Sequence, residues 1–199
     1  MQEIQNAVMS LGFRVCLGES CRCETDCGYA AAPASVKAQD INRAFADPEV
    51  KAVWCVRGGS TAWQVLPLLD YTLIAGHPKP LIGFSDVTTL HLALGQRCGL
   101  VTYHGPTANR VLSWGETDGF SWRSLQRALS LESGLTIENP PGEPIRILRP
   151  GRASGVLTGG NLSLVAASLG TPWQVDAKDR ILFLEDVGEA VYALDRMLS

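Results

Sequence analysis

The sequence predicts an α/β protein in which a parallel sheet is flanked by helices. Apolar, strand-like segments alternate with helical patterns at short intervals, which is typical of this fold class. The segment over residues 50–56 has almost no polar side chains, as expected for a strand that is covered on both faces. Unusual residues follow three successive strands, and ligands of parallel sheets bind beyond the carboxyl ends of the strands. A site is therefore expected at that edge of the sheet.

The elements of the first half follow from local patterns. Apolar residues at helical spacing predict a helix over residues 4–11, and a short strand is expected at 13–15. Ser35 is expected to cap a helix that ends before Asp47-Pro48. The elements expected next are a strand over 50–56, a helix over 62–69, a strand over 81–83, a helix after residue 85 and a strand over 100–103.

A change of composition marks the second half of the chain. After a helix expected over residues 122–131, prolines gather among polar residues, which indicates a linker. We divide the chain into an N-terminal α/β domain (residues 1–134), a Pro-rich linker (135–152) and the start of a C-terminal domain (153–199). The last part is expected to hold a helix that ends near residue 169, a strand over 180–186 and a helix from about residue 189.

Composition and charge argue against several classes of function. The chain has 46% hydrophobic and 19% charged residues, which is ordinary for a globular protein. A net charge of −3 gives no electrostatic reason to expect nucleic acid or an anionic membrane as a partner. No apolar run approaches the roughly 18 residues that span a bilayer, and residues 1–6 lack the pattern of a signal peptide. We therefore expect a cytoplasmic protein.

The strongest chemical signal lies in Gly83-Phe84-Ser85-Asp86, where an apolar strand meets a helical pattern. A serine on that turn has its hydroxyl raised clear of the sheet, and the first amides of the helix point toward the same space. This arrangement suits a nucleophile whose reaction builds up an oxyanion. Helix capping by Ser85 or Asp86 is the alternative, because both residue types commonly cap helices.

A glycine loop follows the preceding strand, at Arg57-Gly58-Gly59. Glycines let the main chain approach a ligand closely, so this loop can supply one amide of an oxyanion hole. Asp86, the residue after the candidate nucleophile, can supply the other amide. A plain strand-to-helix turn is the alternative for the loop.

A serine nucleophile needs a base, and the chain contains three histidines. His77 lies in a surface turn, and His91 lies well down the helix that follows Ser85. His104 ends a neighbouring strand, so it is the one candidate near Ser85, with a structural role as the alternative.

Glu185 ends an apolar strand and is expected either to be a satisfied strand-end group or to orient a catalytic base. Asp186 and Glu189 compete with it for that role. The Gly-x-Ser-x-Gly elbow of α/β-hydrolases is absent because Val87 occupies its last position. No phosphate-binding loop or dinucleotide fingerprint occurs either.

Four of the six cysteines, Cys16, Cys21, Cys23 and Cys27, fall within twelve residues. Their spacing contains no C-x2-C pair of the kind that zinc ribbons use. We expect reduced thiols on a loop and assign no metal. A metal-binding regulator that uses these four thiols is the weakest of three functional hypotheses.

Taken in order, these motifs resemble those of the serine LD-carboxypeptidase family, which includes muramoyl-tetrapeptide carboxypeptidases and microcin-immunity peptidases. The resemblance runs through nearly the whole chain. The matching stretches are residues 46–52, 57–59, 66–71, 80–90, 103–106, 157–162, 170–172 and 181–196.

The resemblance implies a first domain like that of class I glutamine amidotransferases, followed by part of a smaller β-rich C-terminal domain. It implies a Ser-His-Glu triad with Ser85 as nucleophile and Glu185 as the glutamate. Asp86, Gly58 and Gly59 match the oxyanion-hole region. The implied partner is a small peptide substrate, murein tetrapeptide, which loses its terminal D-Ala during cell-wall recycling. No metal or organic cofactor is implied, and a homodimer is left open.

The sequence departs from the family pattern in four places, one of which is that the four-cysteine loop is richer in cysteine than the family requires. None of its histidines matches the family histidine, which lies in the C-terminal part beyond residue 199, and the opening strand of the family is also absent. The usual Arg-Gly-Gly-Tyr-Gly has Ser60 and Thr61 in its last two positions. We therefore expect a member truncated at both ends, with an incomplete triad. The alternative function is a non-catalytic remnant that at most binds peptide.

Overall fold

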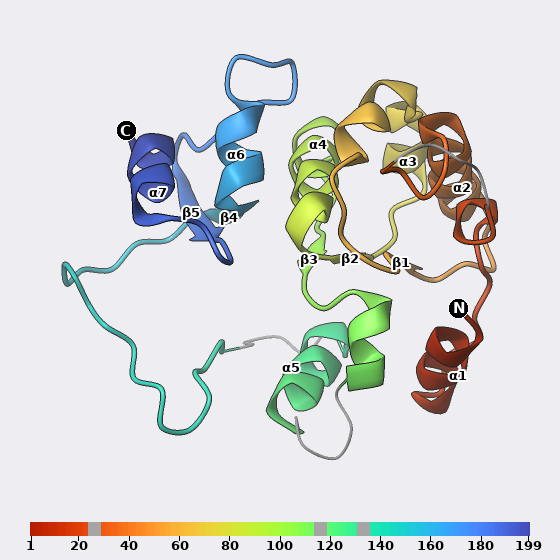
Figure 1. Ribbon diagram of the computed structural model, residues 1–199, viewed down its shortest axis with the longest axis horizontal. Coiled ribbons are helices and arrows are strands. Elements are labelled where there is room, and N and C mark those ends of the chain that lie inside the picture. The colour runs from red at the N-terminus through yellow and green to blue at the C-terminus, as the bar shows by residue number, and fades with distance from the viewer. Residues whose placement is uncertain (24–28, 114–118, 131–135) are drawn as a thin grey trace.

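The computed structural model describes residues 1–23, 29–113, 119–130 and 136–199 (Figure 1). Three parallel strands form the N-terminal sheet in the order β1-β2-β3. They are β1 (Val53–Trp54), β2 (Leu81–Gly83) and β3 (Tyr103–His104). The predicted α/β class with a parallel sheet and flanking helices is confirmed.

Helices lie on both sides of this sheet (Figure 1). On one side are α2 (Ala34–Ala46), α3 (Tyr71–Gly76) and α4 (Thr88–Cys98), and on the other are α1 (Gln2–Ser10) and α5 (Gly119–Leu129). Short 3-10 turns connect them at Glu19–Cys21, Ala62–Gln64, Leu66–Leu68, Ser85–Val87 and Ala108–Ser113.

Local chemistry explains where these helices begin and end. The side chain of Asp70 caps α3 by accepting a hydrogen bond from the Leu73 amide at 2.9 Å. Helix α4 ends at Gly99, which adopts the left-handed conformation with φ 63° that a glycine reaches without strain. The core lies between the sheet and α2, α3 and α4, and its fully buried side chains include Phe45, Leu66 and Ile74.

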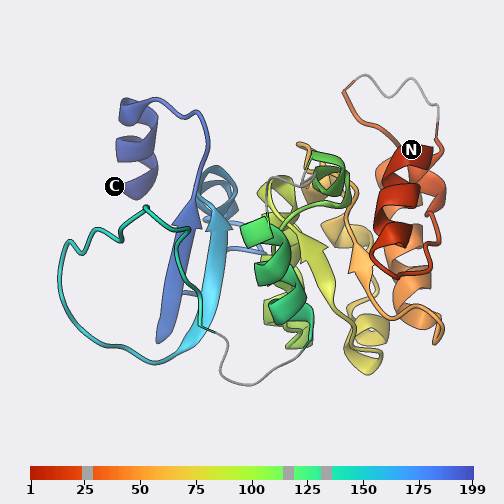
Figure 2. The ribbon, with the colours of Figure 1, turned by 90° about the horizontal axis from the view of Figure 1, so that it is seen from below.

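The C-terminal part is a second parallel pair of strands, β4 (Val156–Asn161) and β5 (Arg180–Glu185) (Figure 2). Their register pairs Asn161 with Glu185 at the carboxyl ends of both strands. Helix α6 (Leu162–Ser168) connects them and packs on α4, and α7 (Val191–Leu198) packs on α6. The side chain of Asn161 caps α6 by accepting from the Leu164 amide at 3.2 Å.

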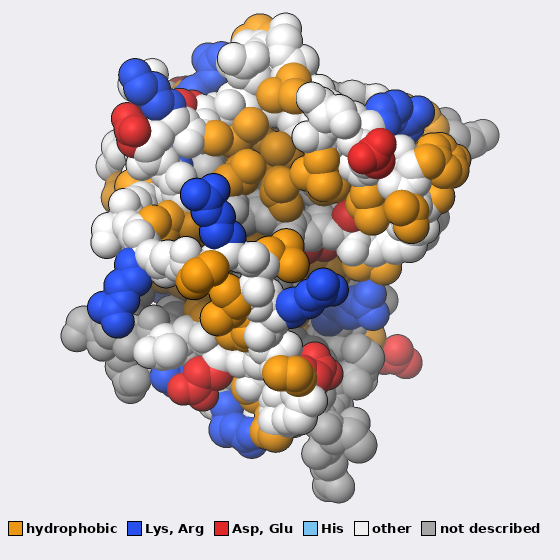
Figure 3. Space-filling view, turned by 90° about the vertical axis from the view of Figure 1, so that its left-hand side faces the viewer, with side chains coloured by type: hydrophobic (Ala, Val, Ile, Leu, Met, Phe, Trp, Pro, Cys, Tyr) orange, Lys and Arg blue, Asp and Glu red, His pale blue; other side chains and the backbone are white. Residues whose placement is uncertain are grey.

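This C-terminal part leaves apolar side chains exposed. Figure 3 views the molecule from the side on which α7 lies, and orange apolar side chains are spread over that face. The exposed large apolar residues of the strands and α7 are Val156, Leu157, Ile181, Leu182, Val191, Tyr192 and Leu198.

Several predicted elements differ in the structure. Residues 13–15 form no strand, because no backbone ladder joins them to a neighbour, and the Phe13 ring meets Trp54 edge-on instead. Residues 62–69 form two 3-10 turns rather than an α-helix, since Pro67 has no N–H to donate to the preceding turn. Ser35 is not a cap, because α2 begins one residue earlier after Pro33.

The other predicted elements are confirmed with shifts at their ends. Strand β1 is shorter than expected, and β3 lies at residues 103–104 instead of 100–103. The expected end of the fifth helix at residue 131, and the start of the linker, lie outside the described residues. No helix in the described ranges is long and apolar enough to cross a membrane.

Candidate active site

Ser85 stands on the turn between β2 and α4 with φ 64°, in the left-handed region. Among the described non-glycine residues only Asp179 shares a positive φ. Such a backbone costs of order 1–3 kcal/mol and persists only where its surroundings enforce it. Gly83 contributes to the sharp turn, because a Cβ there would lie 2.9 Å from both Cγ atoms of Val87. The predicted elbow geometry is therefore present.

Ser85 faces a cavity of about 420 Å³. The ends of all three N-terminal strands and of the β4–β5 pair contribute to its walls. The lining residues are Arg57, Gly58, Gly59, Phe84, Ser85, Thr107, Asn109, Arg110, Asn161, Glu185, Asp186 and Val187. The structure thus brings Ser85, the glycine loop and Glu185 around one space, at the sheet edge where the sequence predicted a site.

The glycine loop lies against the candidate nucleophile. A Cβ on Gly58 would lie 3.1 Å from both Cβ and Oγ of Ser85, so a larger residue would press on the serine. Asp86 also belongs to the first turn after the strand, where leading amides have no acceptor within the helix. The amides expected for an oxyanion hole therefore lie on the two chain segments nearest Ser85.

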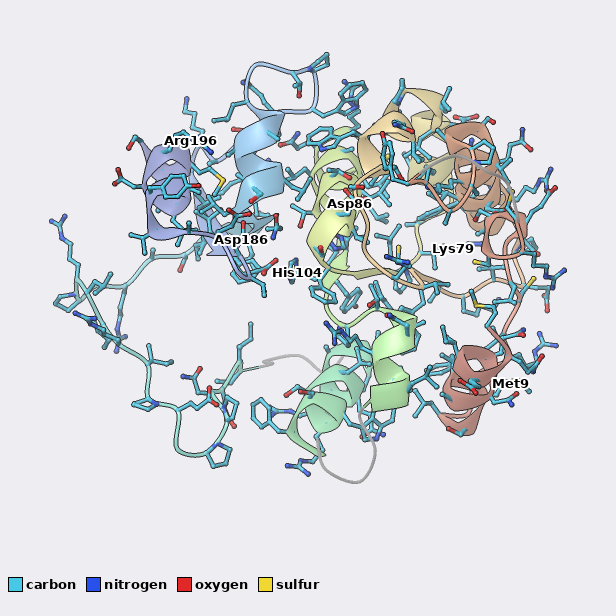
Figure 4. The ribbon with its side chains drawn as sticks, viewed as in Figure 1. Met9, Lys79, Asp86, His104, Asp186 and Arg196 are labelled. Atoms are coloured by element: carbon cyan, nitrogen blue, oxygen red, sulfur yellow. The ribbon has the colours of Figure 1, made fainter. Side chains whose placement is uncertain are left out.

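The side chain of Asp86 has a role that the sequence did not reveal. Its buried carboxylate accepts hydrogen bonds from the amides of Thr61 and Ala62, at 2.9 Å and 3.0 Å. These bonds fasten the end of the glycine loop to the elbow. Figure 4 labels Asp86 at the start of α4. Its donors lie some 25 residues earlier in the chain, so no local pattern indicated the contact.

Glu185 reaches the cavity from the end of β5, and its register neighbour Asn161 lies beside it. Its Oε1 is buried and has no hydrogen bond within the described residues, and the nearest basic atom is His104 Nε2 at 3.6 Å. Burial raises the pKa of Glu185, the charge of Asp186 adds to the rise, and a hydrogen bond from Asn161 opposes it. Glu185 therefore combines a cavity position with unused acceptor capacity.

The two competing carboxylates behave differently. Asp186 accepts hydrogen bonds from the amide and hydroxyl of Ser163, at 3.0 Å and 2.6 Å, and from the Val187 amide at 2.8 Å. Burial alone would raise the pKa of Asp186, but these hydrogen bonds together lower it. Asp186 is thus a satisfied structural group, and Glu189 is exposed and does not line the cavity.

None of the three histidines is hydrogen-bonded to Ser85 among the residues the structure describes. His77 is exposed, and its Nδ1 lies 3.0 Å from the Leu73 carbonyl oxygen. His91 is buried with Nε2 at 2.9 Å from the Gly83 carbonyl oxygen, and burial chiefly lowers its pKa to about 4.

His104 lies where β3 approaches the β4–β5 pair (Figure 4), with its ring edge-to-face against Phe183 at a centroid distance of 5.0 Å. Burial lowers its pKa, which favours the neutral imidazole. It is near Glu185 but does not line the cavity that holds Ser85. The geometry therefore favours the structural alternative for His104 over the role of base.

The cysteine cluster of the sequence is only partly described by the structure. Within the described ranges, no three His, Cys, Asp or Glu side chains lie close enough together to hold a metal ion. Cys16, Cys21 and Cys23 form no disulfide within the described residues, and Cys27 lies outside them. Cys55 is partly buried against the core, and burial chiefly raises its pKa to about 12.

A parallel sheet with a serine on the strand-to-helix turn and a carboxylate across the same cavity is an arrangement typical of hydrolases. Residues 1–105 match the family described as LD-carboxypeptidase N-terminal domain, and residues 154–199 match the LD-carboxypeptidase C-terminal domain. The chain belongs to the LD-carboxypeptidase family.

Curated relatives and solved structures agree with this assignment. The chain is 38% identical over 189 residues to a probable murein peptide carboxypeptidase of Bacillus subtilis, covering 95% of this chain and 58% of that protein. It is 39% identical over 178 residues to the murein tetrapeptide carboxypeptidase of Pseudomonas aeruginosa, covering 85% and 56%. An MccF-like protein from Bacillus anthracis superposes with a TM-score of 0.80 at 28% identity, covering 98% and 65%.

This chain thus spans 58% of the length of the Bacillus subtilis relative. Sequence reasoning missed five cavity residues, Thr107, Asn109, Arg110, Asn161 and Val187, as parts of a site. The first three directly follow the strand that ends in His104, so the rule that sites form at carboxyl ends of strands was the available signal.

Proposed function

We propose that the protein is a serine-type LD-carboxypeptidase that removes the terminal D-alanine from murein tetrapeptides during cell-wall recycling in the cytoplasm. The observation that carries this proposal is the position of Ser85. It has φ 64°, lies against Gly58 and opens into the cavity that Glu185 also lines. The names of the Bacillus subtilis and Pseudomonas aeruginosa relatives support the substrate class.

In this mechanism Ser85 Oγ attacks the carbonyl carbon of the bond that joins the terminal D-amino acid to the preceding residue. The negative charge that develops on the carbonyl oxygen is stabilised by amides of the Gly58–Gly59 loop and by the amide of Asp86. The hydrogen bonds from Thr61 and Ala62 to the Asp86 carboxylate hold the loop in position before the substrate arrives. Preorganised donors of this kind typically contribute a factor of about 10²–10³ each.

Glu185 orients the base that takes the proton of Ser85. Its buried Oε1 is available to accept an imidazole N–H, and its neighbour Asn161 fixes the carboxylate. Because none of the three histidines is hydrogen-bonded to Ser85, the base comes from polypeptide that this chain does not include. The amino group of the leaving D-alanine then receives the proton, and water hydrolyses the acyl-enzyme.

The test is release of D-alanine from murein tetrapeptide by the longest reading frame that contains residues 1–199. We expect Ser85→Ala to lower kcat by at least about 10³-fold and Glu185→Gln by about 10²–10⁴-fold. The exposed residues Ser130 and Glu143 provide matched controls, and Ser130→Ala and Glu143→Gln should leave kcat unchanged. Full activity of Ser85→Ala would refute the proposal.

The second candidate is a non-catalytic peptide-binding protein, and the absence of a histidine against Ser85 in the described residues favours it for the 199-residue chain alone. The chain should then bind the tetrapeptide without turnover. D-alanine release by the 199-residue chain would overturn this second reading, and His104→Gln would then test whether His104 is the base.

A further inference from the structure

Arg57 brings a positive charge to the cavity that the candidate nucleophile lines. It directly precedes Gly58, whose Cβ position is 3.1 Å from Ser85 Oγ, and it lines the same cavity. Its side chain is exposed, and its guanidinium forms no ion pair within the part of the chain that the structure describes. An unpaired arginine at this position has its hydrogen-bonding capacity free for a ligand.

Neither acidic residue of the cavity forms an ion pair with Arg57. The carboxylate of Asp186 accepts hydrogen bonds from Ser163 and Val187, and the basic group nearest to Glu185 is His104. Arg110 is the other cation of the lining, and it already has an interaction within the protein. Arg57 is therefore the cation whose partner remains to be explained.

The chemistry of a terminal peptide bond supplies such a partner. When Ser85 attacks the last peptide bond, the free carboxylate carbon is three bonds from the attacked carbonyl carbon, within about 4 Å. The long side chain of Arg57, which precedes Gly58, can span this distance to the carboxylate. The planar fork of an arginine matches a carboxylate with two parallel hydrogen bonds.

We propose that Arg57 binds the free carboxylate of the leaving amino acid and so restricts the site to the last residue of a peptide. This inference rests on the proposed function and deepens it, because it names the group by which the substrate is recognised. A peptide whose terminal carboxylate is blocked as an amide offers no anion to Arg57. Its carbonyl oxygen also leaves some of the arginine N–H groups without an acceptor.

The experiment measures binding calorimetrically to the Ser85→Ala variant of the longest reading frame that contains residues 1–199, and this substitution excludes turnover. The probes are L-Ala-γ-D-Glu-meso-diaminopimelate-D-Ala and the same peptide with a terminal carboxamide. With Arg57 present, we expect the acid to bind about tenfold to a hundredfold more tightly than the amide. In Arg57→Gln the acid should lose that advantage to within about twofold, while the affinity for the amide stays the same.

Lys51→Gln is the matched control. It removes the same unit of charge, but Lys51 precedes β1 while Arg57 follows it, so the two lie toward opposite ends of the strand. Discrimination between acid and amide should be unchanged in this variant. Equal melting temperatures for the three proteins would establish that Arg57→Gln is folded.

Each remaining outcome decides at least one of the two proposals. Equal binding of acid and amide by the Arg57-containing chain overturns the role of Arg57 and leaves the proposed function standing. Discrimination that survives Arg57→Gln but disappears in Arg110→Gln assigns the carboxylate to Arg110 and also overturns it. If neither peptide binds to the Arg57-containing chain, the proposed function fails together with this inference.

Discussion

The two sheets of this molecule differ in how completely they are covered. In the N-terminal sheet, Leu81 and Ile82 of the central strand are 0% and 1% exposed beneath helices on both sides. In the β4–β5 pair, Val156 is 63% exposed and Leu182 is 45% exposed. Apolar burial is the main driving force of folding, so the N-terminal region should carry most of the stability of this chain.

The proposed active site draws on both regions. Ser85 and the glycine loop belong to the well-covered region, whereas Glu185 belongs to the sparsely covered pair. The junction between them includes close polar contacts, such as the hydrogen bond from the Asn161 amide to Thr88 Oγ1 at 3.0 Å and the bond from Trp173 Nε1 to the Tyr71 hydroxyl at 3.2 Å. The position of Glu185 relative to Ser85 therefore depends on this junction.

The largest expected contrast is between a buried residue of the N-terminal core and an exposed residue of the C-terminal part. Phe45 is 0% exposed in the N-terminal core, and Val191 on α7 is 82% exposed. Phe45→Ala should lower the free energy of unfolding by about 3–5 kcal/mol. Val191→Ala should change it by less than about 0.5 kcal/mol. Urea unfolding followed by circular dichroism measures both.

Comparable losses of unfolding free energy in Phe45→Ala and Val191→Ala would contradict the stated difference between the two regions, because they would mean that α7 contributes to a buried core. A further check is Ile74→Val, a smaller deletion at another fully buried position. It should cost about 0.5–1.5 kcal/mol, which distinguishes a packed interior from a loosely filled one.

The next effect is a dependence of the free energy of unfolding on pH, caused by the buried His91 side chain. The pKa of His91 is lowered to about 4, mainly by burial, against 6.5 for the ordinary side chain. Between these pH values the unfolded chain binds a proton at this position and the folded chain does not. Stability should therefore fall as the pH is lowered from 6.5 to 4, by about 3 kcal/mol in total, and should not depend on this group above that range.

His91→Gln removes the titration while keeping an N–H that can donate to the Gly83 carbonyl oxygen, as Nε2 does at 2.9 Å. Free energies of unfolding measured from pH 7 to pH 4 should then show a flatter decline than in the unaltered chain. His104 titrates in the same direction and faces His91 at a centroid distance of 5.9 Å, so His104→Gln separates the two contributions. An unchanged slope in His91→Gln would refute the assignment.

The features that the sequence predicted are those formed by residues close together in the chain. The strand, turn and helix around Ser85 are contiguous, so apolar pattern and turn chemistry were sufficient for β2, Ser85 and α4. The fastening of Asp86 to Thr61 and Ala62, and the alignment of Glu185 with Asn161, depend on how distant segments pack. The exposed strands were also beyond prediction, because an apolar run does not reveal what covers it.

The smallest effect concerns the junction itself. Gly160 has φ 136°, and a Cβ there would lie 2.6 Å from Thr88 Oγ1, which is fully buried and accepts the Asn161 amide. Gly160→Ala should therefore lower the free energy of unfolding by more than the strain of the positive φ alone would. Gly170 is the matched control, since it has φ 76° and its Cβ would meet no atom within 4 Å.

We expect Gly160→Ala to destabilise the chain by about 1–3 kcal/mol more than Gly170→Ala, because the added methyl group displaces Thr88 or β4. The displacement should reach Asn161 and Glu185, which pair at the end of the same two strands. Affinity for the tetrapeptide should then fall in Gly160→Ala and remain in Gly170→Ala. Equal stability and equal affinity in the two variants would mean that β4 and Thr88 can move apart without cost. Glu185 would then be positioned by β5 alone.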